Sequence, residues 1–403
     1  MAENLINPDT GRSIKIGGPT YLRLLKEGKI VPPPQSSPKK AVKVSPKKAV
    51  KVSPKKAVKV SPKKAVAAQP VPEEKVPPTI PPHQITEEER LVPFGTNLKL
   101  KYQQKRANEN RNRVLHWGQR KLLLSEIEFL TMYGDLSETV VYVGAANGQH
   151  IPLLLEMFPK HRFILYDPAN FHPHTIEQAK AFPQRLTIVQ DYFNDKIALE
   201  YKGQSVLYIC DIRRVPSDIK EGAKDYEKVF AKLIEEDMTM QQKWYYAMRP
   251  AATMLKFRPQ FVDFSDPIGG TLTYLAGRVY RQVWAPPNST EARLIVVGPS
   301  AQQTSYSELE YEQLMCYFNV IVRPSPYLLP TNLEPLEHKY DIIHYDMAGE
   351  LFILEQYVKL FLPSEPVLKA LEGLEKKIEK ILNKNFKRKW VEYRSRLDPE
   401  RED

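Results

Sequence analysis

From about residue 110 onward, short apolar runs alternate with stretches in which apolar residues recur at helical spacing. Apolar runs of four to eight residues are typical of buried strands, and recurrence every three or four residues is typical of helices. We therefore predict helices over residues 119–132, near 151–158 and over 217–248. The strands that we predict are residues 140–143, 163–166, 186–189, 206–210, 253–257, 271–283 and 293–297.

Strands that alternate with helices favour a mostly parallel sheet, because parallel neighbours need a crossover connection. We predict an α/β fold, a Rossmann-like doubly wound sheet that binds ligands at the carboxyl ends of its strands, in one domain over residues 84–363. Apolar residues at helical spacing within residues 368–390 predict an amphipathic helix in a C-terminal segment, 364–403. Docking of this helix on its own domain and docking on a partner both remain open.

The N-terminal part of the chain has a different composition. Residues 37–66 repeat Ser-Pro-Lys-Lys-Ala-Val-Lys-Val every eight residues, and a Pro-rich stretch follows up to residue 83. Regular prolines and like charges oppose both a helix and a packed core, so we predict disorder over residues 37–83. Loose, sequence-blind contact with nucleic acid and a merely solubilising linker are the two interpretations of this tail.

The net charge of +11 resides in that tail. Residues 37–66 contain eleven lysines and no acid, whereas the chain from residue 67 onward has 43 basic and 45 acidic residues. Two cysteines, Cys210 and Cys316, are too few for a disulfide framework, and no run of about 18 apolar residues is present. We therefore expect a soluble protein of a reducing compartment with no membrane partner.

A glycine turn follows the first predicted strand. Gly144 and Gly148 lie in Val-Gly-Ala-Ala-Asn-Gly-Gln-His, and Asp167 ends the next strand, where a carboxylate accepts hydrogen bonds from ribose hydroxyls. A dinucleotide-binding dehydrogenase normally has three glycines in this turn, so the broken pattern favours a methyl donor. A purely structural glycine turn is the alternative.

Four charged residues each interrupt an otherwise apolar stretch: Lys121, Asp211, Lys256 and Glu291. This Lys-Asp-Lys-Glu order resembles the tetrad of the FtsJ-like 2′-O-methyltransferases. The flanking residues, over about 100–362, resemble the cap-specific mRNA methyltransferases of poxviruses and other large DNA viruses. That family also provides the small, processivity-promoting subunit of viral poly(A) polymerase. The resemblance implies S-adenosyl-L-methionine as cofactor, capped mRNA as substrate, and a place in the virion and the host cytoplasm.

Removal of a ribose hydroxyl proton during methyl transfer needs a well-placed base. We predict Lys256 as that base, with Lys121 as the neighbouring cation that lowers its pKa, Asp211 orienting it, and Glu291 holding Lys121 and the ribose. The chemistry requires no metal, and no set of His and Cys ligands is apparent.

The resemblance also implies binding residues by position. Those for the cofactor are Gln119, Tyr142, Gly144, Gly148, His150, Asp167, Phe193, Asp211 and Arg213. A methylated guanine is cationic and is held by aromatic stacking with acids at its edge. The cap residues predicted on this basis are Phe261, Asp263 and Glu312, with Trp284 or Tyr102 as the second aromatic. The sequence departs from the family at Ala169, where an arginine is expected, and at Asn288, where an aromatic is expected.

Three further segments leave alternatives open. Residues 1–36 resemble a small adaptor module of large DNA viruses, to which we attach no chemistry. The basic residues within 99–113 form either an RNA track or a solvated helix. For the whole chain, a non-enzymatic processivity subunit that associates with a poly(A) polymerase catalytic subunit is the second hypothesis, and a chromatin-like DNA-binding protein is the third.

Overall fold

The computed structural model describes residues 80–101, 115–217, 219–220, 225–260, 270–336 and 343–382, except the side chain of Glu227. The chain divides into two compact units, Met1–Glu73 and Glu74–Asp403. In the first unit the description is limited to two short antiparallel strands, β1 (Leu5–Ile6) and β2 (Ser13–Ile14). Residues 37–79 of the predicted disordered tail lie outside the described residues, and so does most of the N-terminal module. Residues 80–83 are described and end in the short strand β3 (His83–Gln84), so the predicted disorder does not extend to residue 83.

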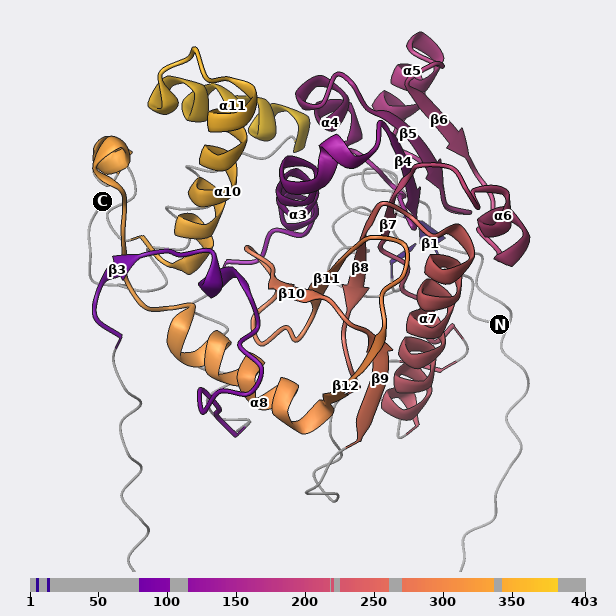
Figure 1. Ribbon diagram of the computed structural model, residues 1–403, viewed down its shortest axis with the longest axis horizontal. Coiled ribbons are helices and arrows are strands. Elements are labelled where there is room, and N and C mark those ends of the chain that lie inside the picture. Colours follow the sequence, from indigo (N-terminus) through magenta and orange to yellow (C-terminus); the bar gives the residue numbers. More distant parts are fainter. Residues whose placement is uncertain are drawn as a thin grey trace, which may run out of the picture. The chain divides into compact units, whose positions relative to one another are not determined.

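The second unit is built on a seven-stranded sheet with the order β10-β11-β8-β7-β4-β5-β6 (Figure 1). The five strands from β8 to β6 are parallel, and β11 and β10 add an antiparallel edge. This order confirms the predicted doubly wound, mostly parallel α/β fold. The strands are β4 (Thr139–Val143), β5 (Arg162–Tyr166), β6 (Leu186–Val189), β7 (Leu207–Cys210), β8 (Ala252–Phe257), β10 (Arg278–Arg281) and β11 (Ala292–Val297).

Helices cover the sheet in two groups (Figure 1). Helices α3, α4, α10 and α11 pack on one another, and α6 packs with α7. The first group is α3 (Gly118–Tyr133), α4 (Ile151–Met157), α10 (Tyr345–Phe361) and α11 (Val367–Leu382). The others are α5 (Pro173–Ala181), α6 (Asp195–Glu200), α7 (Tyr226–Met248) and α8 (Glu308–Tyr317), with a π-helix, η3 (Phe318–Val322). In the described part of the chain no helix is both long and apolar enough to traverse a bilayer.

Short elements complete this unit. Three of them are 3-10 helices: η1 (Glu88–Arg90), η2 (Gly134–Leu136) and η4 (Thr331–Leu336). Two further pairs of strands lie outside the main sheet: β3 (His83–Gln84) with β13 (Tyr327–Leu328), and β9 (Thr271–Leu275) with β12 (Gln303–Ser307).

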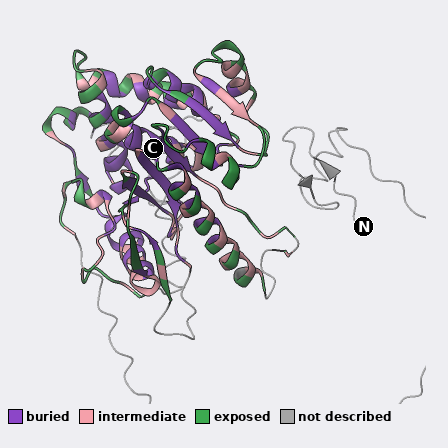
Figure 2. Cartoon of the chain, turned by 45° about the vertical axis from the view of Figure 1, so that its right-hand side comes forward, coloured by how far each residue is buried: buried purple, intermediate pink, exposed green. Residues whose placement is uncertain are grey.

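The core follows the strand pattern expected for a parallel sheet. Strands β4, β7 and β8 are buried along almost their whole length, because helices cover both faces. Figure 2 shows this buried sheet between partly exposed helices. The carboxyl ends of β4, β7 and β8 consequently meet at one edge, where polar side chains can converge.

Two predicted elements differ from the structure. The strand predicted over 271–283 is two strands, β9 and β10, and β9 pairs with β12 outside the main sheet. The break falls at Ala276 and Gly277, where a Cβ on Gly277 would lie 2.5 Å from the backbone oxygen of Ile295, so only glycine allows this approach. The long helix predicted from 217 begins at Tyr226.

The predicted C-terminal helix is α11, and it docks on its own domain. Its apolar stripe, which includes Leu374 and Ile378, is buried against α10, α4 and α3. The side-chain amide of Gln149, in the glycine turn, donates a hydrogen bond to the backbone oxygen of Ile381 at 2.9 Å. Residues of the predicted helix beyond Leu382 lie outside the described part of the chain.

Candidate active site

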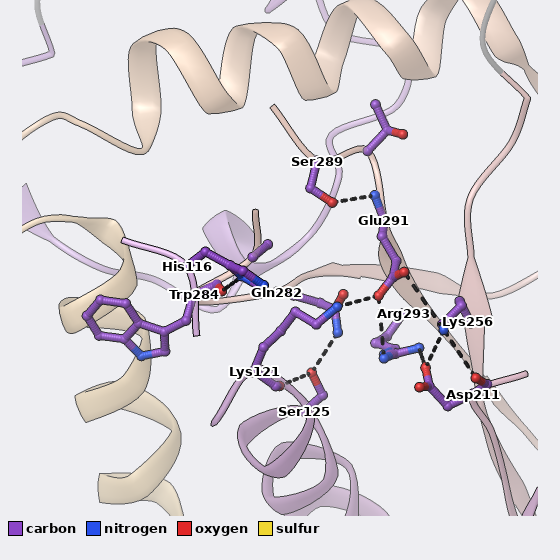
Figure 3. A network of polar contacts seen from close by, with 12 residues as sticks. His116, Lys121, Ser125, Asp211, Lys256, Gln282, Trp284, Ser289, Glu291 and Arg293 are labelled. Atoms are coloured by element: carbon purple, nitrogen blue, oxygen red, sulfur yellow. Dashed lines mark hydrogen bonds and ion pairs between the residues drawn. The ribbon is translucent and has the colours of Figure 1, made fainter. Parts of the chain in front are cut away.

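The four charged residues singled out in the sequence lie together at the carboxyl edge of the sheet (Figure 3). Lys121 comes from α3, Asp211 follows β7, Lys256 lies on β8, and Glu291 precedes β11. Lys121 Nζ donates to Glu291 Oε1 at 2.6 Å. Lys256 Nζ lies 3.1 Å from Asp211 Oδ1 and 3.9 Å from Glu291 Oε2. We call these four residues the tetrad.

A fifth charge, Arg293, completes this cluster and was missed in the sequence. Its Nη1 lies 2.6 Å from Asp211 Oδ1, and its Nη2 lies 3.7 Å from Glu291 Oε1. Arg293 pairs with Lys256 in the β11–β8 register. Side chains two residues apart on a strand share a face, so the Glu-Ala-Arg spacing of Glu291 and Arg293 was the available signal.

The pKa values of Lys121, Asp211 and Glu291 are all lowered, but the physical causes differ. Burial lowers the pKa of Lys121, and the positive charge of Arg293 adds to this, although Glu291 opposes it. For Asp211 and Glu291, burial favours the neutral carboxyl, but the surrounding cations outweigh it and lower both pKa values. Both acids are therefore ionised at neutral pH.

The glycine turn after β4 lies against the cluster because Gly144 lacks a side chain. Gly144 has a φ of +80°, and a Cβ there would lie 2.8 Å from the backbone carbon of Asp211. Gly148 has a φ of +66°. Asp167, after β5, accepts hydrogen bonds from the amides of Ala146 at 3.0 Å and Ala169 at 2.8 Å. The two predicted glycines and the predicted ribose carboxylate thus form one connected turn.

A buried acid on α3, Glu126, organises three of the predicted cofactor residues. Tyr142 donates its hydroxyl to Glu126 Oε1 at 2.6 Å, and His150 Nε2 lies 2.7 Å from Glu126 Oε2. His150 Nδ1 is in turn 3.0 Å from Gln119 Oε1. Tyr142 and His150 are almost fully buried, so their contacts with Glu126 connect the turn to α3. Gln119, at the other end of this hydrogen-bond network, is more exposed. Glu126 occupies a helical position without a local motif, and we did not predict it.

The remaining predicted cofactor residues lie at the ends of neighbouring strands. Phe193, after β6, packs edge-on between Tyr166 and Trp244, with ring centroids 4.9 and 5.0 Å away. Arg213 follows Asp211, and its three guanidinium nitrogens are buried without a hydrogen-bond partner among the described residues. Cys210, which ends β7, is buried as well, and burial raises the pKa of its thiol to about 12.

The cap residues are less well placed. Trp284 is only 2% exposed and donates Nε1 to Glu350 Oε2 at 2.6 Å, so its ring belongs to the core and does not offer a face for stacking. The prediction of Trp284 as the second aromatic is therefore wrong. Glu312 is buried on α8. Tyr102, Phe261 and Asp263 lie outside the described residues.

The described residues contain no group of three or more His, Cys, Asp or Glu side chains arranged to hold a metal ion. What this part of the chain offers is a dense mixture of amines, guanidinium groups and carboxylates next to a glycine turn. Such a cluster can move a proton and stabilise charge at one edge of the sheet.

Two solved structures match this chain at low similarity. A methyltransferase of Burkholderia thailandensis acting on 1,6-didemethyltoxoflavin is 14% identical, with 43% of this chain and 60% of that chain covered and a TM-score of 0.20. An amino pentose methyltransferase of Micromonospora echinaspora is 12% identical, with coverages of 54% and 88% and a TM-score of 0.22. Because these TM-scores are low, the fold assignment rests on the strand order of the sheet and not on these two structures.

Sequence relatives are closer. The cap-specific mRNA (nucleoside-2′-O-)-methyltransferases of two strains of Myxoma virus, Lausanne and Uriarra, are each 27% identical over 273 residues, which cover 63% of this chain and 75% of each relative. A family model described as poly A polymerase regulatory subunit matches residues 95–364. This range is more than half of the chain and includes the glycine turn and all of the tetrad, which confirms the resemblance found in the sequence. The chain belongs to the poly(A) polymerase regulatory subunit family.

Proposed function

We propose that the chain is an S-adenosylmethionine-dependent methyltransferase that methylates the ribose 2′-hydroxyl of the first transcribed nucleotide of capped mRNA. The observation that carries the proposal is the convergence of Lys121, Asp211, Lys256 and Glu291 beside the glycine turn. The printed activity of the two Myxoma virus relatives supports the same substrate class.

The residues around the glycine turn fit the proposed cofactor. When bound, S-adenosylmethionine supplies a methyl group on a sulfonium. Asp167 has carboxylate oxygens that can accept from ribose hydroxyls, and Gly144 and Gly148 keep the turn free of side chains. Gln119, held by His150, offers an amide at the α3 side of the turn. Asp211, whose backbone lies against Gly144, carries an ionised carboxylate that can stabilise a neighbouring positive charge.

Lys256 is the residue placed to take the hydroxyl proton. Its Nζ donates to the backbone oxygen of Asp211 at 3.1 Å and lies at the same distance from that residue's Oδ1. These contacts fix the amine, and a neutral amine in this position has its lone pair available to the substrate hydroxyl. The hydroxyl proton would pass to Lys256 Nζ as the ribose oxygen takes the methyl group that bound S-adenosylmethionine would supply. Glu291, held by Lys121, is placed to orient the ribose.

The test is transfer of labelled methyl to short RNA by the full chain. We expect label on the ribose of the first nucleotide of capped RNA, and no label when that ribose carries a 2′-hydrogen in place of its hydroxyl. Label on a base, or equal labelling of the 2′-deoxy RNA, contradicts the proposal.

Membership of the regulatory subunit family favours a second role, as an RNA-binding processivity subunit of a poly(A) polymerase. Both roles use the same RNA-binding fold and can coexist. The Lys256→Ala variant separates them, because it removes the proposed base and leaves the fold. A variant that still lengthens poly(A) tails made by a cognate polymerase without transferring methyl groups would support both roles. Failure of the wild-type chain to change tail length would contradict the second one.

We also propose that the lysine-rich tail adds loose contact with RNA in the virion and the host cytoplasm. Eleven lysines without a compensating acid in residues 37–66 attract phosphates irrespective of sequence. Deletion of residues 37–66 should weaken RNA binding and reduce its dependence on salt, without an effect on cofactor binding. An unchanged salt dependence in a band-shift series would contradict this role.

A further inference from the structure

Residues 284–290 connect strand β10 to Glu291, and the described contacts attach this connection to helices outside the sheet. We call residues 284–290 the β10–β11 connection. Trp284 and Asn288 have positive φ angles of 56° and 60°. Asparagine adopts this region more readily than other non-glycine residues, but a bulky residue such as Trp284 keeps it only when its surroundings hold it there. The connection therefore needs external support to keep its shape.

Arg323, at the end of η3, holds the first half of the connection. Its guanidinium donates to the backbone oxygens of Ala285 at 2.6 Å and Pro286 at 3.2 Å. Its Nε donates to Asp346 Oδ2 at 2.9 Å, and Asp346 Oδ1 accepts from the backbone nitrogen of Trp284 at 2.9 Å. Arg323 and Asp346 are both buried, so these contacts exchange little with water.

Asn319 and Tyr311 hold the second half. Asn319, on η3, donates its amide to the backbone oxygen of Ser289 at 2.9 Å and accepts from Arg323 Nη1 at 3.2 Å. Tyr311, on α8, donates its hydroxyl to the backbone oxygen of Thr290. Backbone groups along the connection, up to the residue before Glu291, are thus fixed by side chains of α8, η3 and α10.

The connection also touches the other half of the tetrad. The backbone oxygen of Trp284 accepts from the nitrogen of Trp117 at 3.0 Å, and the oxygen of Trp117 accepts from the nitrogen of Lys121 at 2.8 Å. The start of α3, which carries Lys121, therefore depends on one end of the connection, and Glu291 follows the other end. A displacement of the connection changes the separation of Lys121 and Glu291.

We infer that Arg323 is a positioning residue for the Lys121–Glu291 pair, and through it for the ribose of the RNA rather than for the cofactor. This inference rests on the proposed function. A guanidinium is needed because it presents five N–H groups in a rigid plane, and an ammonium cannot reach the two carbonyls, Asn319 and Asp346 together.

The test compares Arg323→Lys with Arg185→Lys in the full chain. Arg185 is a matched control, because its guanidinium also clamps backbone oxygens, those of Leu155, Phe158 and His161, away from the tetrad. For Arg323→Lys we expect kcat to fall about 10- to 100-fold and KM for capped RNA to rise, since small misplacements at a reaction centre have effects of this size. The Kd for S-adenosylhomocysteine, measured by calorimetry, should remain unchanged. Arg185→Lys should change none of the three.

Hydrogen exchange gives a readout that does not need activity. The amides of Trp284, Ser289 and Glu291 donate hydrogen bonds within or beside the connection, so they should exchange faster in Arg323→Lys and not in Arg185→Lys. If Arg323→Lys does not fold, Asn319→Ala, which removes the contact with Ser289, should show the same direction with a smaller effect.

Kinetic constants of Arg323→Lys equal to those of Arg185→Lys would overturn the inference. An equal loss of S-adenosylhomocysteine binding and of kcat would overturn it as well, because the defect would then be general. A wild-type chain that transfers no methyl to capped RNA would instead refute the proposed function, and the exchange data would still show whether Arg323 holds the connection.

Discussion

The two sides of the tetrad are held in place by different kinds of contact. On the cofactor side, which we define as residues 144–150 and Asp167, backbone amides and glycine conformations shape the turn close to the strand ends. On the RNA side, defined as residues 284–291, side chains from distant helices hold the backbone. The first side takes the shape of its backbone from local contacts and is supported from outside by Glu126 of α3 and by the contact of Gln149 with α11. The second side has its backbone held directly by side chains of α8, η3 and α10. Changes to the two sides should therefore have separable effects.

The largest effect is expected at the tetrad itself, where the two sides meet. Lys256→Ala removes the proposed base and should lower methyl transfer to capped RNA by at least about 100-fold, the usual scale for loss of a general base. Binding of S-adenosylhomocysteine should persist, because Lys256 is not part of the glycine turn. Labelled-methyl assays and calorimetry on the same preparation measure both. Activity equal to that of the wild type would rule out Lys256 as the base.

A substitution at Gly144 should damage the cofactor side. Gly144→Ala adds a Cβ 2.8 Å from the Asp211 backbone at a φ of +80°, so we expect cofactor affinity to fall at least tenfold, together with about 1–3 kcal/mol of unfolding free energy. Gly203→Ala is the matched control, because Gly203 has a φ of +83° and no atom within 4 Å of the added Cβ. Gly203→Ala should lower the free energy of unfolding without changing cofactor affinity. Equal cofactor affinity in the two variants would show that the close approach to Asp211 is unimportant.

The buried acid on α3 allows a finer separation of the two sides. Glu126→Gln weakens the contacts with Tyr142 and His150 that support the turn. We expect the Kd for S-adenosylhomocysteine to rise about 3- to 10-fold, the equivalent of about 0.7–1.4 kcal/mol, with KM for capped RNA unchanged. Glu128→Gln, on the same helix but paired with Arg90, is the control and should leave both constants unchanged. A change in KM for RNA without a change in the Kd for S-adenosylhomocysteine would show that Glu126 acts on the RNA side, contrary to this prediction.

The smallest effect concerns acid stability. Burial opposes ionisation of Glu291, but its three neighbouring cations outweigh this and hold its pKa well below the ordinary 4.5. The stability that this carboxylate contributes is complete above pH 4.5 and is lost as the pH falls through its lower folded-state pKa. The difference in unfolding free energy between wild type and Glu291→Gln should therefore be constant from pH 7 to about 5 and shrink below it. Denaturant titrations across this range measure this difference in unfolding free energy. A difference that grows on acidification would contradict the prediction.

The glycine turn after β4 and the place of Asp167 can be predicted from the sequence because their determinants are local. Strand β4 and the glycine turn were identified from an apolar run followed by two glycines, and Asp167 from its place at the end of the next strand. The tetrad was found through family resemblance, because nothing in the local sequence brings Lys121 of α3 to Glu291 before β11.

The missed residues share a physical reason. Glu126, Arg293 and Arg323 are charged residues whose partners lie far away in the sequence, and each looks like an ordinary surface residue until the fold pairs it. Trp284 is the opposite case. The sequence predicts it as a stacking residue for the cap, but its indole nitrogen donates to the buried Glu350 of α10, a contact that depends on the packing of that helix.

The two cysteines differ in their environment and therefore in their expected reactivity. The thiol of Cys210 is buried at the end of β7 with a pKa raised to about 12, so it stays protonated and unreactive near neutrality. The second cysteine, Cys316, is half-buried on α8, the helix whose Tyr311 holds Thr290. A thiol-directed reagent should accordingly react with Cys316 in preference to Cys210 in the native protein.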